Sequence, residues 1–143
     1  MWEAVELVGP YTQRQAPSLL QRADLLLHTK YNDPCPTIVL EALACGLPVV
    51  YSATGGVPEL VSHDAGVGIP APLDWEHDQP PAPAALAAGV LEVAERLEER
   101  SDAARARAMR FDSRAWIARH RAVFEGLVHP GGSGDAAGIL SRS

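Results

Sequence analysis

Short apolar runs alternate with helical patterns over the first half of the chain. Four such runs predict short strands, at Val5–Val8, Asp24–His28, Leu47–Tyr51 and Gly66–Ile69. Helical spacing between them predicts helices over Ala16–Arg22 and Thr37–Cys45, and a short helix that opens at Pro58. This order of elements indicates an α/β fold, namely a partial doubly wound, Rossmann-like parallel sheet of about four strands with flanking helices.

The second half of the chain is predicted to hold a loop and then helices. Prolines crowd the stretch from Pro70 to Pro83, which indicates a loop, and Ala84–Leu127 is predicted to form two or three helices. We expect one domain over residues 1–128 and a disordered tail over residues 129–143. Because further βα units usually precede this point of a doubly wound domain, we also expect the sequence to begin part-way through a fold.

The charge pattern excludes broad classes of partner. A net charge of −6 argues against binding to nucleic acid or to anionic membranes, since both need clustered Lys and Arg. Lys30 is the single lysine, and the arginines gather between Arg96 and Arg121, interleaved with Glu and Asp. That late cluster is predicted to be a solvated helical surface of mixed charge, with an anion site as the alternative.

The sequence lacks the patterns of a membrane span, a leader peptide and a cysteine metal site. No apolar run reaches the length of a membrane span, and the residues after Met1 do not resemble a leader peptide, so we expect a cytoplasmic protein with no integral membrane segment. Cys35 and Cys45 do not have the spacing of a metal site. We predict that both are reduced packing residues and that no metal is bound.

The stretch from Tyr31 to Gly46 runs from a predicted strand into a helix and is the candidate site. Pro36 suits the first helical turn, which leaves the N–H groups of Thr37 and Ile38 free to bind a phosphate. Every strand-to-helix turn has some of this character, so an ordinary turn is the alternative. No dinucleotide, triphosphate, zinc-protease or serine-hydrolase motif is present.

Two carboxylates accompany this turn. Glu41 is the only charge in a helix of apolar residues, and Asp33 lies eight residues before it, just ahead of the helix. The two acids can bracket one ligand. The alternatives for Glu41 are that it lies on a solvent-exposed face of the helix or pairs with an arginine. The alternative for Asp33 is that it belongs to an Asp-Pro turn. Gly55 and Gly56 follow the next strand and let backbone approach a ligand, or form a tight turn.

With these residues in place, the chain resembles the C-terminal nucleotide-sugar-binding domain of family-4-type retaining GT-B glycosyltransferases (glycosyl transferases group 1). The resemblance rests on the acid pair Asp33 and Glu41 with seven residues between them, on the continuation Ala42–Val50, and on Gly55–Leu60. It is strong from Val5 to Val61 and looser to Leu127.

The resemblance implies metal-independent retaining transfer from a nucleotide-sugar substrate such as a UDP- or GDP-sugar, with no cofactor. Asp33 would be the catalytic-site acid that contacts donor-sugar hydroxyls, and Glu41 would accept hydrogen bonds from the ribose diol. Backbone N–H groups at Thr37 and Ile38 would face the diphosphate. Gly9 and Tyr11, at the end of the first predicted strand, match a region that contacts the base.

The chain also departs from the family pattern. The first acid is commonly Glu, and Pro36 stands where the family often has Gly. The diphosphate-binding Arg and Lys lie upstream of Val5 in the family, Lys30 does not match them, and the acceptor is held by an N-terminal domain. We therefore expect a fragment without useful turnover. The alternatives are a non-catalytic Rossmann-like nucleotide-binding or protein-interaction module, and a GT-B epimerase or phosphorylase.

The C-terminal helical pattern carries an apolar stripe with one imidazole, made of Trp116, His120, Val123, Phe124 and Leu127. The alternative, which we accept for Val123, is that the stripe packs on the domain's own sheet. In GT-B enzymes the final helix reaches back across the cleft to the other domain, so the resemblance implies that part of the stripe and a strand edge are exposed here. This exposure predicts self-association, with Trp116 or Phe124 at the contact.

Overall fold

A three-stranded parallel sheet forms the centre of the protein. The computed structural model describes residues 4–128, in two compact units of which the first ends at Arg110 and the second begins at Phe111. The strands are β1 (Leu26–His28), β2 (Val49–Ser52) and β3 (Gly66–Ile69), in the order β1-β2-β3. Val50 lies opposite Leu27 on one side and Val67 on the other. The predicted α/β class and parallel sheet are confirmed.

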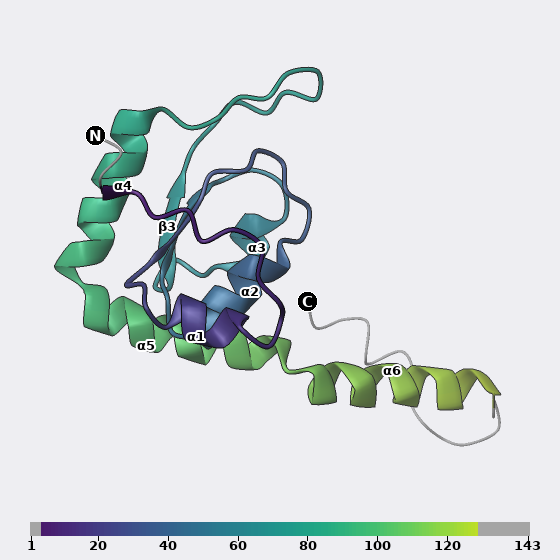
Figure 1. Ribbon diagram of the computed structural model, residues 1–143. Coiled ribbons are helices and arrows are strands. Elements are labelled where there is room, and N and C mark those ends of the chain that lie inside the picture. The colour runs from purple at the N-terminus through teal and green to yellow at the C-terminus, as the bar shows by residue number, and fades with distance from the viewer. Residues whose placement is uncertain (1–3, 129–143) are drawn as a thin grey trace. The chain divides into compact units, whose positions relative to one another are not determined.

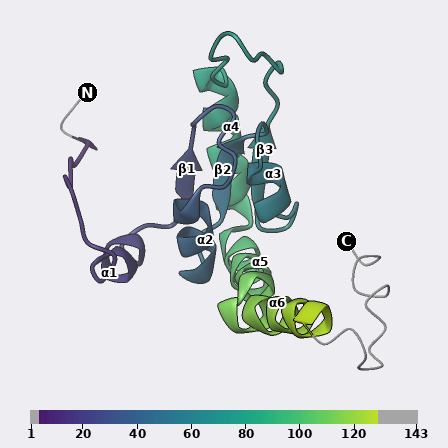
Figure 2. The same ribbon diagram turned by 90° about the vertical axis from the view of Figure 1, so that its right-hand side faces the viewer.

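The prediction of a strand at Val5–Val8 is wrong. This segment has no regular structure, and its apolar side chains are exposed, Leu7 by 91%. Figure 2 shows it running apart from β1. A short strand needs a neighbour to take up its backbone hydrogen bonds. Val5–Val8 finds none in the described part of the chain, where the sheet therefore has three strands and not four.

The helices lie close to their predicted positions. In chain order they are α1 (Ala16–Leu20), α2 (Thr37–Ala44), α3 (Val57–Leu60), α4 (Pro83–Glu95), α5 (Leu97–Ala108), a 3₁₀ turn η2 (Met109–Phe111) and α6 (Ser113–Val128). The region predicted as two or three helices holds three α-helices, and residues 70–82 form the predicted loop. No helix in residues 4–128 is long and apolar enough to cross a membrane.

Helices cover both faces of the sheet, as Figure 1 shows for α2 and α3 on one side and α4 on the other. All four residues of β2 are buried. Val49 and Tyr51 pack with α2, α3 and α5, whereas Val50 packs with Val93 of α4. Each fully buried Val or Leu contributes about 1.5–3 kcal/mol relative to an exposed one, so this two-sided burial holds the strands in place.

A glycine, Gly46, ends α2. Gly46 has φ +80°, and its N–H donates to the carbonyl of Leu43 at 2.9 Å while Leu47 N–H donates to Ala42 at 2.9 Å. Left-handed backbone of this kind suits glycine and satisfies the last carbonyl groups of a helix. The hydroxyl of Ser101 donates to the Gly46 carbonyl at 2.7 Å and so ties α5 to this turn.

The prediction that the late arginines are simply solvated is wrong for Arg100. This side chain of α5 is 6% exposed. Its guanidinium donates to the carbonyls of His63 and Gly66, at 3.1 and 2.9 Å, and to the Glu92 carboxylate at 2.7 Å. Acceptors at three of its hydrogen bonds make burial of this cation tolerable, although its Nε has no hydrogen-bond partner among the described residues. Arg100 thus fastens the segment before β3 to α5.

The second unit contains α6, and the predicted stripe lies on it. The ring centroids of Trp116 and His120 are 3.7 Å apart and the rings stack. No side chain of α6 is buried, and Val123, expected to pack inside, is 43% exposed. Residues 129–143, for which we predicted a tail, lie outside the described residues.

Candidate functional site

The carboxyl ends of the three strands bring the candidate residues to one edge of the sheet. β1 leads into the loop of residues 29–36, β2 into residues 53–56, and β3 into residues 70–82. The first two loops are joined by the N–H of Asn32, which donates to Thr54 Oγ1 at 3.0 Å. Thr54 Oγ1 also shares a hydrogen bond with the buried Ser52 hydroxyl. In doubly wound folds this edge is where ligands bind.

Asp33 lies buried in the first of these loops, with 8% of its surface exposed. One carboxylate oxygen, Oδ2, lies 3.3 Å from Lys30 Nζ and 3.5 Å from His28 Nε2. The other oxygen has no hydrogen bond or ion pair within the described residues. Lys30 therefore forms an ion pair with one side of the carboxylate, His28 Nε2 lies near that side without a hydrogen bond, and the other side is uncommitted.

His28 lies at the end of β1 and is 9% exposed. Burial lowers the pKa of its imidazole below the ordinary value of 6.5, because a charged ring loses its water; the Asp33 carboxylate opposes this shift and Lys30 adds to it. Burial therefore favours the uncharged form of the ring, and Lys30 is the cation beside Asp33. His28 was not among the predicted site residues, and Lys30 was judged not to match the family's cation.

The glycine pair after β2 is needed to pack the two loops together. Gly55 has φ +65°, and a Cβ there would lie 2.4 Å from the Asp33 carbonyl oxygen. A Cβ on Gly56 would lie 2.0 Å from the carbonyl oxygen of Pro34, and the Gly56 N–H donates to the Asp33 carbonyl at 2.9 Å. Backbone atoms cannot move aside as a side-chain tip can. The glycine pair therefore positions the loop of residues 29–36, here called the Asp33 loop, whether or not the pair also approaches a ligand.

The first turn of α2 offers unpaired N–H groups at the same edge. Pro36 is the residue just before the helix, with φ −72° and ψ 114°, and Thr37 is its first residue. The N–H of Val39 donates to the Pro36 carbonyl, whereas the N–H groups of Thr37 and Ile38 have no partner within the described residues. Thr37 is exposed and the Ile38 side chain packs on the core. The predicted phosphate-binding groups are these two backbone N–H groups, at the positive end of the helix dipole.

Glu41 lies one turn further along α2 and is partly exposed. Within residues 4–128 its carboxylate makes no hydrogen bond or ion pair, so the arginine partner that was one alternative is not found there. It is the only charge on α2. A carboxylate in this position is available to a ligand that offers hydroxyl or N–H donors.

Gly9 and Tyr11, predicted to contact the base, lie in the irregular N-terminal stretch. Gly9 has φ +74° with no atom within 4 Å of an added Cβ, and Tyr11 is 45% exposed. Among residues 4–128, no hydrogen bond or ion pair links either residue to Asp33 or Glu41. The prediction that both cysteines are packing residues is wrong for Cys35, which is exposed.

The loop after β3 joins the site through two residues that sequence reasoning did not single out. The hydroxyl of Tyr31 donates to the Pro72 carbonyl at 2.6 Å, and Asn32 Nδ2 donates to the Asp74 carbonyl at 3.2 Å. An open cavity of about 350 Å³ is lined by Tyr31, Asn32 and residues 74–78. Two larger depressions on the described surface include neither Asp33 nor Glu41. The only sequence signal for this contact was that residues 31 and 32 directly precede Asp33.

Known proteins similar to this chain include proteins named as glycosyltransferases. D-inositol 3-phosphate glycosyltransferase of Salinispora arenicola (strain CNS-205) is 40% identical over 55 residues, which are 38% of this chain and 12% of that protein. The gpi3 subunit of phosphatidylinositol N-acetylglucosaminyltransferase of Schizosaccharomyces pombe (strain 972 / ATCC 24843) is 32% identical over 59 residues, 41% of this chain and 13% of that protein. N-acetyl-alpha-D-glucosaminyl L-malate synthase of Bacillus anthracis is 35% identical over 51 residues, which are 36% of this chain and 13% of that protein.

The matched part of the chain thus spans about an eighth of the length of these relatives. The model of the family "Glycosyl transferases group 1" matches residues 1–107, which contain the whole sheet and every candidate site residue. The chain belongs to the glycosyl transferases group 1 family.

Proposed function

We propose that this chain is the donor-binding part of a retaining, metal-independent glycosyltransferase whose donor is a nucleotide sugar such as a UDP- or GDP-sugar. The observation that carries the proposal is that the Glu41 carboxylate has no partner in the described residues. Glu41 follows two unpaired N–H groups, those of Thr37 and Ile38, at the ligand-binding edge of a parallel sheet.

Each candidate residue has a distinct role in this proposal. Glu41 accepts hydrogen bonds from the two ribose hydroxyls, because the two carboxylate oxygens suit a vicinal diol. The N–H groups of Thr37 and Ile38 bind the diphosphate, where negative charge grows as the glycosyl bond breaks. Asp33 contacts donor-sugar hydroxyls through the oxygen that Lys30 and His28 leave free.

The remaining parts of the proposal concern the ends of the donor and the acceptor. Gly55 and Gly56 hold the Asp33 loop against the donor sugar, and Gly9 and Tyr11 contact the base. The acceptor is held by a separate N-terminal domain, in keeping with relatives that are much longer than the matched segment. The 143-residue chain alone is then inactive as a transferase and retains weak donor binding.

Calorimetric titration of the whole chain with UDP, GDP and their sugars tests the ribose role. Glu41→Gln is expected to weaken binding of free nucleotide and nucleotide sugar alike by about tenfold, since hydrogen bonds to a charged group contribute about 1.5–3 kcal/mol. Glu95→Gln, which changes an exposed acid on α4, is the matched control and should change nothing. Clear nucleotide binding with the same affinity in Glu41→Gln would contradict the assignment.

The same titration separates the role of Asp33. Asp33→Asn should weaken binding of the nucleotide sugar more than binding of the free nucleotide, because only the former places hydroxyls at this carboxylate. Equal losses for both ligands would remove the distinction. A chain that binds no nucleotide and associates tightly with another protein would instead be a non-catalytic interaction module.

A further inference from the structure

The loop of residues 70–82 is anchored to the Asp33 loop by hydrogen bonds that span over forty positions of sequence. Tyr31 is 8% exposed, and its hydroxyl donates to the Pro72 carbonyl and accepts from the N–H of Asp74 at 2.5 Å. Asn32 Nδ2 donates to the Asp74 carbonyl. Each of these bonds joins the loop after β3 to one of the two residues that precede Asp33. The bonds therefore hold the base of the loop beside the candidate site.

Asp74 also orders the tip of this loop. Its carboxylate accepts from the N–H groups of Glu76 and His77, at 2.8 and 3.1 Å, and from Gln79 Nε2 at 3.3 Å. These bonds lower the pKa of Asp74, with the N–H of Glu76 the largest cause. Trp75 is 81% exposed between these residues. A large aromatic ring is thus presented to solvent on an ordered loop.

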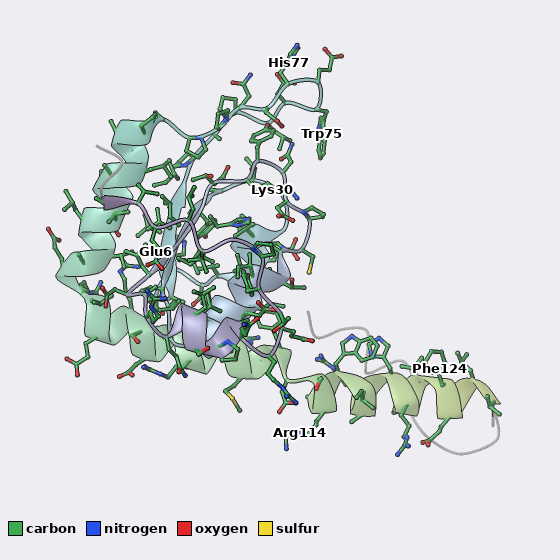
Figure 3. All side chains as sticks on the ribbon, viewed as in Figure 1. Glu6, Lys30, Trp75, His77, Arg114 and Phe124 are labelled. Atoms are coloured by element: carbon green, nitrogen blue, oxygen red, sulfur yellow. The ribbon has the colours of Figure 1, made fainter. Side chains whose placement is uncertain are left out.

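Trp75 lines the cavity of about 350 Å³ together with Tyr31, Asn32 and Asp78. In Figure 3 its side chain hangs from the loop on the side of Lys30. Ligand pockets for small molecules begin at about 300 Å³. Asp74, Glu76 and Asp78 also line the cavity. Asn32 Oδ1 is buried without a hydrogen-bond partner in the described residues. The cavity combines one flat apolar surface with several acceptors.

We propose that this cavity is a subsite for a pyranose ring, with Trp75 as the surface on which the ring stacks. A pyranose has an apolar face of C–H groups and a rim of hydroxyl donors, which matches a cavity lined by an indole, three acidic residues and Asn32. The location rests on the proposed function, because the subsite adjoins the Asp33 loop through Asn32. The ring can come from the donor's glycosyl group or from an acceptor saccharide, and both share this chemistry.

Titration of the whole chain with free nucleotides, nucleotide sugars and methyl pyranosides tests the proposal. Trp75→Ala is expected to weaken binding of the sugar-bearing ligands by about fivefold, in line with the strength of stacked aromatic contacts, and Trp75→Phe to restore most of it. Free UDP or GDP should bind Trp75→Ala as they bind the original chain. Trp116→Ala, which removes an exposed tryptophan of α6, is the matched control and should have no effect.

The outcomes separate this subsite from the donor site. A loss confined to nucleotide sugars assigns the ring to the donor, and a loss confined to methyl pyranosides assigns it to an acceptor; either supports the subsite. Sugar binding that is unchanged in Trp75→Ala overturns the subsite and leaves the donor site standing. Binding of methyl pyranosides without any nucleotide binding overturns the donor site alone, whereas no binding of any ligand overturns both.

Discussion

Helices α2 and α6 were both predicted from apolar spacing, and both are helices, yet their side chains end in opposite environments. On α2, Val39 and Leu43 are 0% exposed and pack against the sheet. On α6, Trp116 is 54% and Phe124 63% exposed, and no residue of that helix is buried. Spacing along the chain predicts that a helix has an apolar side, but burial of that side depends on a partner elsewhere.

The largest expected contrast is in stability. Leu43→Ala should lower the free energy of unfolding by about 2–5 kcal/mol, because it leaves a cavity in a packed core. Phe124→Ala on α6 should change it by less than about 0.5 kcal/mol. Urea denaturation followed by circular dichroism measures both. Similar losses in the two variants would mean that α6 has a buried partner in solution.

A pair of glycine substitutions sharpens the comparison. Gly56→Ala should destabilise the fold by about 1–3 kcal/mol, because its Cβ would meet the Pro34 carbonyl oxygen at 2.0 Å. Gly126→Ala on α6 has free space around the new methyl and should increase helix stability by about 0.5–1 kcal/mol. Thermal melts of both variants decide the matter. Tolerance of alanine at position 56 would show that the Asp33 loop is not held as closely as described.

His28, which is buried, and His120, which is on α6, allow a comparison by pH. Because burial lowers the pKa of His28 below 6.5 in the folded state, the unfolded chain binds this proton more readily. The stability that His28 contributes is therefore present above pH 6.5 and is lost as the pH falls below it. His28→Gln should lessen the fall in stability between pH 7 and pH 5, measured by urea denaturation at each pH. His120→Gln on α6 is the control, and an equal effect there would refute the assignment to burial.

The smallest effect is expected in association. Exposed Trp116 and Phe124 should produce weak, concentration-dependent oligomers, visible as a rise in sedimentation coefficient across a dilution series. Phe124→Asp should reduce this rise, while Leu73→Asp, at an exposed apolar residue of the loop after β3, should not. A single sedimentation coefficient at every concentration would show that the stripe is covered within the chain.

Several site positions followed from local sequence and several did not. The turn into α2 was predicted because a strand, a proline and an apolar helix follow one another within a short stretch, and Asp33 and Glu41 are placed on it by chain order alone. The environment of Asp33 was not predicted. Lys30 and His28 approach its carboxylate through the bend of the loop, whose Asn32 has φ +48°. That bend is held by Thr54, in the loop that follows β2.

The sequence by itself determined the order and type of the elements from Ala16 onward, the parallel class of sheet and the family, because apolar periodicity and motif spacing are properties of neighbouring residues. Only the tertiary structure decided that Val5–Val8 forms no strand, that Arg100 is buried, and that the loop of residues 70–82 joins the Asp33 loop. Each of these outcomes depends on hydrogen bonds to distant parts of the chain. A strand without a neighbour, or a cation among carbonyl groups, cannot be recognised from local pattern, because the partner is supplied by the fold.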